Sequence, residues 1–277
     1  MVAVFRLAGC ALWFALLAIA PPAAADRAII LATTTSVENS GLLDHLLPKL
    51  TAQTGLVVHV VVRGTGAALR LGISGDADIV FVHDRASEDA FIEAGHGVLR
   101  KDVMSSRFLI VGPRGDPAKI SGLTDAPAAL RRIAEAKTLF VSRGDNSGTH
   151  SAELRLWNAA GIDPRGAPAA WYRETGSGMG ATLNIASALG AHLLTESGTW
   201  AKFGNRGELT ILVDNALVNP YGIILVNPQR HPHIVEDDAR KLIDWLTGPD
   251  AQNAIDSFTI NGQHPFRSAA TPKAPAP

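Results

Sequence analysis

The sequence is poor in cysteine, in aromatic residues and in charge. Its 277 residues include one cysteine, and only 6% are aromatic and 18% charged. That cysteine, Cys10, lies in an apolar N-terminal segment, so the rest of the chain has no disulfide and no thiol chemistry. The formal net charge of −1 gives no support for nucleic-acid binding or for a polybasic surface that attaches to a membrane.

The longest apolar run of the N-terminal segment is too short to span a bilayer comfortably, which takes about 20 residues. This run, Leu7 to Ala20, follows Arg6 and is followed by the small residues Ala23 to Ala25. These features predict a signal peptide at residues 1–25 and therefore an exported, periplasmic protein. Leu7-Ala8-Gly9-Cys10 also matches a lipobox, so a lipid anchor at Cys10 is the alternative to ordinary cleavage.

Motifs for metal binding and for hydrolysis are missing as well. The nine histidines are scattered, without a His-Glu-x-x-His motif or cysteine ligands beyond the N-terminal segment. The chain has no Gly-x-Ser-x-Gly nucleophile elbow. We therefore expect no catalytic residue, no metal ion and no cofactor. A periplasmic serine hydrolase that uses Ser147 and His150 is the distant alternative.

Short apolar runs alternate with helical patterns along the chain, which favours an α/β fold. Strands are predicted at residues 28–32, 56–62, 79–82, 108–112, 139–141, 209–213 and 223–226. Polar turns follow several of these strands and precede helices, and the richest turns fall in two separated parts of the sequence. This distribution indicates two α/β lobes with a cleft between them.

The predicted lobes have the following boundaries. Residues 26–108 and 222–267 form the first lobe, and residues 109–221 form the second. Lobes of this size are ordinary domains of about 100–150 residues. Residues 268–277 are rich in alanine and proline, and they are expected to form a disordered tail.

Four polar turns, each before a predicted helix, are rich in hydroxyl groups, glycine or both, and one of them also holds an arginine. Hydroxyls and the free N–H groups of a helix N-terminus suit a tetrahedral anion, and glycine lets the backbone approach it closely. The candidate ligand-binding residues are Thr34, Thr35 and Ser36; Gly64, Thr65 and Gly66; Arg143, Ser147, Gly148 and Thr149; and Ser177, Gly178 and Met179. Ordinary helix capping by serine and threonine is the alternative reading of these turns.

Arg143 is the residue expected to supply positive charge. Its guanidinium can form two charge-assisted hydrogen bonds with one anion. Asp145 has two possible roles. If it faces the ligand, it can accept a hydrogen bond from an anion that carries a proton, such as hydrogen phosphate. If it pairs with Arg143, the site favours anions that carry no proton.

These segments resemble the tungstate-binding proteins of Tup-type ABC importers, and the resemblance covers nearly all of the chain after residue 25. It rests on the segments Thr33 to Ser36, Gly64 to Leu69, Ser142 to His150, Gly176 to Leu183 and Asn219 to Gly222. It implies a type II periplasmic binding fold, with two lobes joined by two crossing strands and the anion held between them. It further implies delivery to a membrane permease, which is the expected contact with the membrane. A monomer is the default expectation.

The resemblance implies tungstate as the ligand, but two alternatives stay open. Molybdate differs very little from tungstate in size and charge. Phosphate-binding proteins share the wider fold, and Arg143-x-Asp145-x-Ser147-Gly148-Thr149 resembles their binding loop too. A two-lobed receptor that feeds a sensor instead of a transporter is a further alternative.

Overall fold

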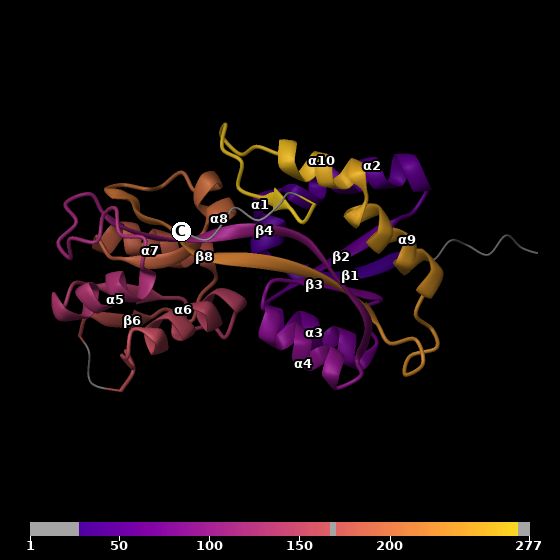
Figure 1. Cartoon of the computed structure of the whole chain (residues 1–277), viewed down its shortest axis with the longest axis horizontal. Helices are drawn as coiled ribbons and strands as arrows, with labels where there is room; N and C mark the ends of the chain where they lie inside the picture. The colour runs from indigo at the N-terminus through magenta and orange to yellow at the C-terminus, as the bar shows by residue number, and fades with distance from the viewer. Residues whose placement is uncertain (1–27, 167–169, 271–277) are drawn as a thin grey trace, which may run out of the picture.

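The computed structural model describes residues 28–166 and 170–270. The predicted signal peptide and Cys10 lie outside these residues. The described chain forms two groups of helices and strands, joined by two long strands, β4 (Gly97–Pro113) and β8 (Leu209–Val226) (Figure 1). These two strands pair antiparallel along their length. No helix in the described part of the chain is both long and apolar enough to cross a membrane.

We call the two groups the first and the second lobe. The first lobe contains β1 (Ile29–Thr34), α1 (Thr35–Ser40), α2 (Leu42–Thr54), β2 (Val58–Arg63), α3 (Thr65–Ser74), β3 (Ile79–Val82), α4 (Arg85–Glu93), α9 (Glu236–Thr247), α10 (Pro249–Ser257) and β9 (Arg267–Ser268). The second lobe contains α5 (Ala126–Glu135), β5 (Phe140–Ser142), α6 (Gly148–Ala159), β6 (Tyr172–Glu174), α7 (Met179–Leu189), β7 (Leu193–Glu196) and α8 (Ser197–Lys202).

One sheet runs through both lobes in the strand order β2-β1-β3-β8-β4-β7. β1 lies parallel to both β2 and β3, so the carboxyl ends of these three strands meet at the same edge of the sheet. Helices α1, α3 and α4 begin at that edge. In open α/β sheets, ligands bind outside the carboxyl ends of the strands.

The apolar core follows the side-chain periodicity of the elements. In the first lobe, Leu42, Leu46 and Leu50 recur every four residues on α2, and all three are buried in one cluster. In the second lobe, alternate residues of β4 enter two different clusters. Phe108 and Ile110 pack with Trp157, whereas Leu109 and Val111 pack with Leu183 and Trp200. Because successive side chains of a strand point to opposite faces, this lobe has a core on each face of its sheet.

The predicted lobe boundaries at residues 108/109 and 221/222 fall within β4 and β8, and they stay a prediction. The predicted start of the disordered tail needs correction. Ser268 pairs with Met104 in the β9–β4 ladder. Its hydroxyl also donates to Asp256 Oδ2 at 2.7 Å, so strand pairing and a side-chain bond hold it in place. Residues 271–277 lie outside the described residues.

Candidate functional site

The first-lobe candidates follow the ends of β1 and β2. Thr34 is the N-cap of α1, and its Oγ1 accepts a hydrogen bond from the Val37 N–H at 3.5 Å. Gly64 is the N-cap of α3, and Thr65 is the first residue of that helix. The two strands are parallel neighbours, with Thr34 opposite Arg63 in the register. The starts of α1 and α3 therefore lie at the same edge of the sheet.

Within these two turns, the side chains differ in exposure. Thr34, Ser36 and Thr65 are buried, Thr35 is half-buried, and Gly64 and Gly66 are exposed. Thr65 Oγ1 has no hydrogen-bond partner in the described part of the chain. An unpaired buried polar group costs about 1–3 kcal/mol. A ligand oxygen at this point would supply the missing acceptor.

The second-lobe candidates surround the start of α6. Ser147 is its N-cap, with the Oγ accepting from the His150 N–H at 3.3 Å, and Gly148 is its first residue. The Arg143 side chain is only 4% exposed. Its Nη1 donates to Thr149 Oγ1 at 3.4 Å, so the guanidinium and this hydroxyl lie next to each other.

Asp145 pairs with Arg143. The Asp145 Oδ2 accepts from Arg143 Nη2 at 2.5 Å and from Nε at 3.1 Å, and its Oδ1 accepts from the Ser147 N–H at 3.2 Å. Burial alone would raise the pKa of Asp145. Hydrogen bonds from Ser147 and the charge of Arg143 outweigh burial and lower that pKa. Of the two roles considered for Asp145, the geometry favours pairing with Arg143.

The two lobes meet at the start of α6. A Cβ added to Gly148 would lie 3.0 Å from Thr65 Oγ1 and 3.3 Å from His83 Cε1, so the absence of a side chain permits this approach. A second link is the ion pair between Asp84, which precedes α4, and Arg155 of α6, with 3.0 Å between Oδ1 and Nη1. We call this region the interlobe junction; it brings together Ser36, Thr65, His83, Arg143, Gly148, Thr149 and Glu196.

The fourth turn packs against the Arg143 segment. The Ser177 N–H donates to the Arg143 carbonyl at 3.2 Å. Gly178 is the N-cap of α7, which has no side-chain cap. The Met179 side chain is buried in the apolar core with Leu183, so its expected ligand contact is limited to its backbone N–H. The structure thus places this turn as support for the arginine.

Glu196, the last residue of β7, is not among the candidates predicted from the sequence. Its side chain is buried, and its Oε1 accepts hydrogen bonds from Ser36 Oγ at 2.9 Å and from Thr149 Oγ1. Glu196 Oε2 has no partner in the described part of the chain. Its position at the end of a buried strand, directly before a helix, is the same signal that marked the other turns. An ionised glutamate only accepts hydrogen bonds, so a pattern of anion donors does not include it.

A further group of buried polar side chains lies beside the junction on β3 and β8. The ring of His83 is 3.2 Å (Nδ1) from Asn219 Oδ1, and the Asn219 amide donates to Ser106 Oγ at 3.1 Å and to Tyr221 OH at 3.2 Å. Burial lowers the pKa of His83, against the raising effect of the Glu196 charge. A neutral imidazole adds no cation here, so Arg143 is the cation at this point of the junction.

The proposed hydrolase pair is not arranged for catalysis. Ser147 Oγ contacts the backbone N–H of His150, while the His150 ring accepts at Nδ1 from the Asn146 N–H at 3.1 Å. The other ring nitrogen lies 3.5 Å from Glu174. The ring is therefore turned to other partners and not to the serine hydroxyl. Among residues 28–166 and 170–270, no three His, Cys, Asp or Glu side chains are grouped to hold a metal ion.

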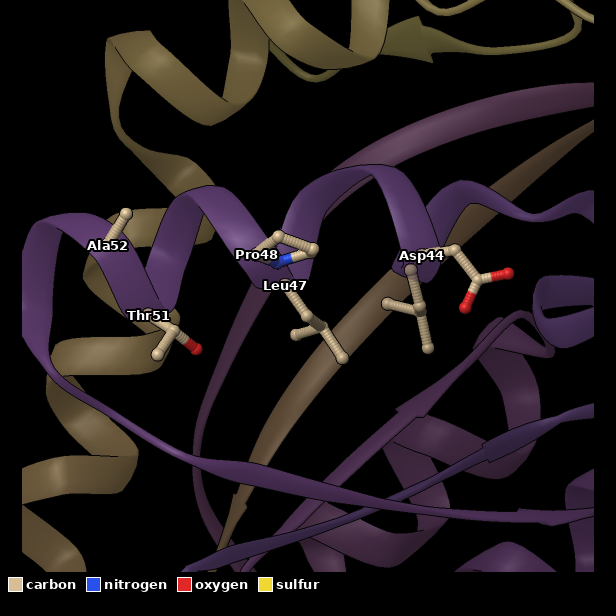
Figure 2. A pocket seen from close by; sticks show the side chains of 6 residues that line it. Asp44, Leu47, Pro48, Thr51 and Ala52 are labelled. Carbon is tan, nitrogen blue, oxygen red and sulfur yellow. The ribbon is translucent and has the colours of Figure 1, made fainter.

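A shallow hollow on the surface lies on α2 and not at the interlobe junction. It is lined by side chains of α2 alone: Leu43, Asp44, Leu47, Pro48, Thr51 and Ala52 (Figure 2). None of these is a candidate donor, and the lining is largely apolar. An anion needs converging donors, so the interlobe junction is the better candidate site.

Comparison with known proteins adds independent evidence. A family model described as a PBP superfamily domain matches residues 20–250. The tungstate-binding protein TupA of Peptoclostridium acidaminophilum is 43% identical over 238 residues, which cover 84% of this chain and 82% of the relative.

Two solved structures are similar over most of the chain. The tungstate ABC transporter structure from Geobacter sulfurreducens is 47% identical, with a TM-score of 0.77, over 83% of this chain and 98% of that one. The tungstate-binding protein TupA from Desulfovibrio alaskensis G20 is 41% identical, with a TM-score of 0.78, over 88% of this chain and 99% of that one. Both matches agree with the two-lobed α/β fold expected from the sequence.

Proposed function

Because this chain belongs to the PBP superfamily and, within it, to the family of the TupA proteins, we propose that it captures tungstate in the periplasm. It then delivers the oxyanion to the permease of an ABC importer. Export with cleavage after Ala25 and a monomeric state are parts of the same proposal. So is the division into lobes at residues 26–108 with 222–267 and 109–221.

The observation that carries the proposal is the convergence of donors at the interlobe junction. The N-termini of α3 and α6 face each other, and both carry partial positive charge and unpaired N–H groups. Arg143 adds a full charge, and the Thr65 hydroxyl is buried without a partner. Such a set of groups suits a small tetrahedral anion enclosed from several sides.

The role of Asp145 favours an anion without a proton. Its carboxylate already accepts from Arg143 and Ser147, which leaves it less available to accept a hydrogen bond from hydrogen phosphate. Tungstate and molybdate carry no proton near neutral pH. The pairing of Asp145 therefore disfavours phosphate as the ligand. The preference for tungstate over molybdate rests on the similarity to the TupA proteins.

Capture in this proposal is a hinge closure between the lobes. An anion bound by one lobe attracts the donors of the other, and β4 with β8 forms the connection about which the lobes move. Closure excludes water and strengthens each charge-assisted bond. The Asp84–Arg155 pair forms across the same junction and adds to the closed state.

Isothermal titration calorimetry of the purified mature chain tests the proposal. Tungstate should bind tightly, with molybdate second and phosphate much weaker. Arg143→Ala should weaken tungstate binding by roughly 10- to 150-fold, because bonds to a charged group contribute about 1.5–3 kcal/mol. The control is Arg114→Ala, a largely exposed arginine that pairs with Glu208. Tight phosphate binding with no heat from tungstate would sink the assignment.

A further inference from the structure

Glu196 accepts hydrogen bonds from two of the candidate ligand residues, one in each lobe. Ser36 on α1 donates to its Oε1 at 2.9 Å, and Thr149 on α6 donates to the same oxygen. Both hydroxyls and the carboxylate are buried. The carboxylate thus stands where donors of the two lobes converge, which is the place expected for one oxygen of a bound anion.

The number of protons limits what these two hydroxyls can do. A serine or threonine hydroxyl carries one donor proton, although its oxygen can accept other bonds. As long as Ser36 and Thr149 donate to Glu196, neither can donate to an oxyanion. An anion that uses these hydroxyls has to take them from the carboxylate.

The charges around Glu196 also oppose the binding of an anion. Arg143, after β5, reaches the carboxylate through Thr149, but it is paired with Asp145. The neighbours on β3 and β8 are His83 and Tyr221. Burial lowers the pKa of His83. Burial and the charge of Glu196 raise the pKa of Tyr221. Neither neighbour supplies a cation. A dianion that enters the junction therefore meets a buried like charge, whose repulsion is strong where water is excluded.

We propose that Glu196 is an internal competitor of the oxyanion, and that its carboxylate sets the affinity of capture by holding the Ser36 and Thr149 hydroxyls. This inference rests on the proposed function. The opposite role would be a positioning role, in which Glu196 orients the two hydroxyls for the ligand. The two roles predict opposite effects when the charge of Glu196 is removed.

The variant that separates them is Glu196→Gln. Glutamine keeps the size and an acceptor oxygen, but its neutral oxygen holds the hydroxyls more weakly than a carboxylate does. If Glu196 competes with the anion, the variant should bind tungstate about tenfold tighter than the natural chain does in calorimetry. Glu208→Gln is the matched control: it removes the same charge from an exposed carboxylate that pairs with Arg114, and its affinity should stay within about twofold.

Equal or weaker tungstate binding by Glu196→Gln would overturn the competitor role. If the natural chain itself does not bind tungstate, the proposed function fails, and this outcome is distinct from the first. Cooperative thermal unfolding of each variant checks that it is folded.

A crystal structure of the natural chain with tungstate tests the same inference without any substitution. We expect Ser36 Oγ and Thr149 Oγ1 within hydrogen-bond distance of tungstate oxygens and beyond about 3.5 Å from Glu196 Oε1. Tungstate held by other groups, with both hydroxyls still donating to Glu196, would contradict the proposal even if the variant does not fold.

Discussion

At the scale of single residues, Thr65 is the clearest marker of the site. Its Oγ1 is buried, it has no partner among the described residues, and it lies at the start of α3 opposite α6. Thr65→Val keeps the shape and removes the hydroxyl. The affinity for tungstate should fall by roughly 5- to 150-fold, which corresponds to about 1–3 kcal/mol for a lost bond in a buried site.

The same substitution should not destabilise the protein without tungstate, because no internal hydrogen bond of Thr65 Oγ1 is lost. Calorimetry gives the affinity, and thermal unfolding gives the stability. Thr247→Val is the control, since the Thr247 hydroxyl bonds to the Ile243 carbonyl on the surface of the first lobe. Unchanged affinity in Thr65→Val would remove this residue from the site.

Glu153 connects stability to pH. It is buried in the second lobe, where its Oε1 accepts from Tyr172 OH at 2.8 Å and from Trp157 Nε1 at 3.3 Å. Burial raises the pKa of Glu153 from 4.5 to about 7. Between pH 4.5 and about 7, Glu153 loses its proton in the unfolded chain but keeps it in the folded chain. The contribution of Glu153 therefore lowers stability as pH rises from about 4.5 to about 7, and this loss persists at higher pH.

Glu153→Gln keeps both hydrogen bonds and cannot ionise. Its free energy of unfolding should match that of the natural chain near pH 4.5 and exceed it by on the order of 3 kcal/mol above pH 7. Urea denaturation at several pH values measures the difference. Glu208→Gln, exposed on the surface, should show no such trend, and a parallel pH profile in Glu153→Gln would contradict the raised pKa.

The sequence predicts candidate donors more readily than acceptors. Arg143, Ser147 and Gly148 stand out because one turn combines a hydroxyl, a glycine and an arginine before a helix. Glu196 and His83 could not be recognised in the same way. Their importance depends on which side chains they meet across the junction, and Ser36 and Glu196 are 160 residues apart in sequence.

At the scale of elements, the contact between α6 and α3 depends on Gly148. A Cβ at this position would lie 3.0 Å from Thr65 Oγ1. Gly148→Ala should therefore obstruct the approach of the lobes and weaken tungstate binding by roughly 5- to 150-fold, since overpacking costs about 1–3 kcal/mol. The helix itself should not suffer, because alanine is the better helix former.

Calorimetry and small-angle X-ray scattering with tungstate measure this effect, and the variant should keep a larger radius of gyration than the natural chain. Gly180→Ala in α7 is the matched control, because a Cβ there meets nothing within 4 Å. An unchanged affinity in Gly148→Ala would show that the junction has room for a methyl group.

The strands predicted at residues 28–32, 56–62, 79–82 and 139–141 correspond to β1, β2, β3 and β5, whereas the buried strand β7 and the full length of the connecting strands were not predicted. The sequence predicted strands at 108–112, 209–213 and 223–226, whereas β4 spans Gly97–Pro113 and β8 spans Leu209–Val226 without a break. The missing parts include exposed residues such as Asp102, Asp214 and Asn215. The crossing segments mix buried residues such as Val103 and Tyr221 with exposed polar ones, so they lack the regular apolar pattern that periodicity analysis detects.

At the scale of the whole molecule, two lobes with a site between them follow from the distribution of polar turns. The sequence could not provide the pairs that join the lobes, such as Asp84 with Arg155, because both partners look like ordinary surface charges in their own helices. The family resemblance supplied the fold type, the ligand and the role of the junction. The residues themselves predict the kind of ligand, and the location of its donors stays a prediction.

The position of β8 in the sheet has a consequence for the order of folding. β8 lies between β3 and β4, although it is the second-to-last strand in the sequence. The sheet of the first lobe therefore stays incomplete until residues near Val226 have joined it, with Ile79 paired to Leu225. Chains rich in such distant pairings fold slowly. The second lobe takes its helices from one continuous stretch, so we expect it to form first and the sheet of the first lobe to be completed only when β8 has joined it.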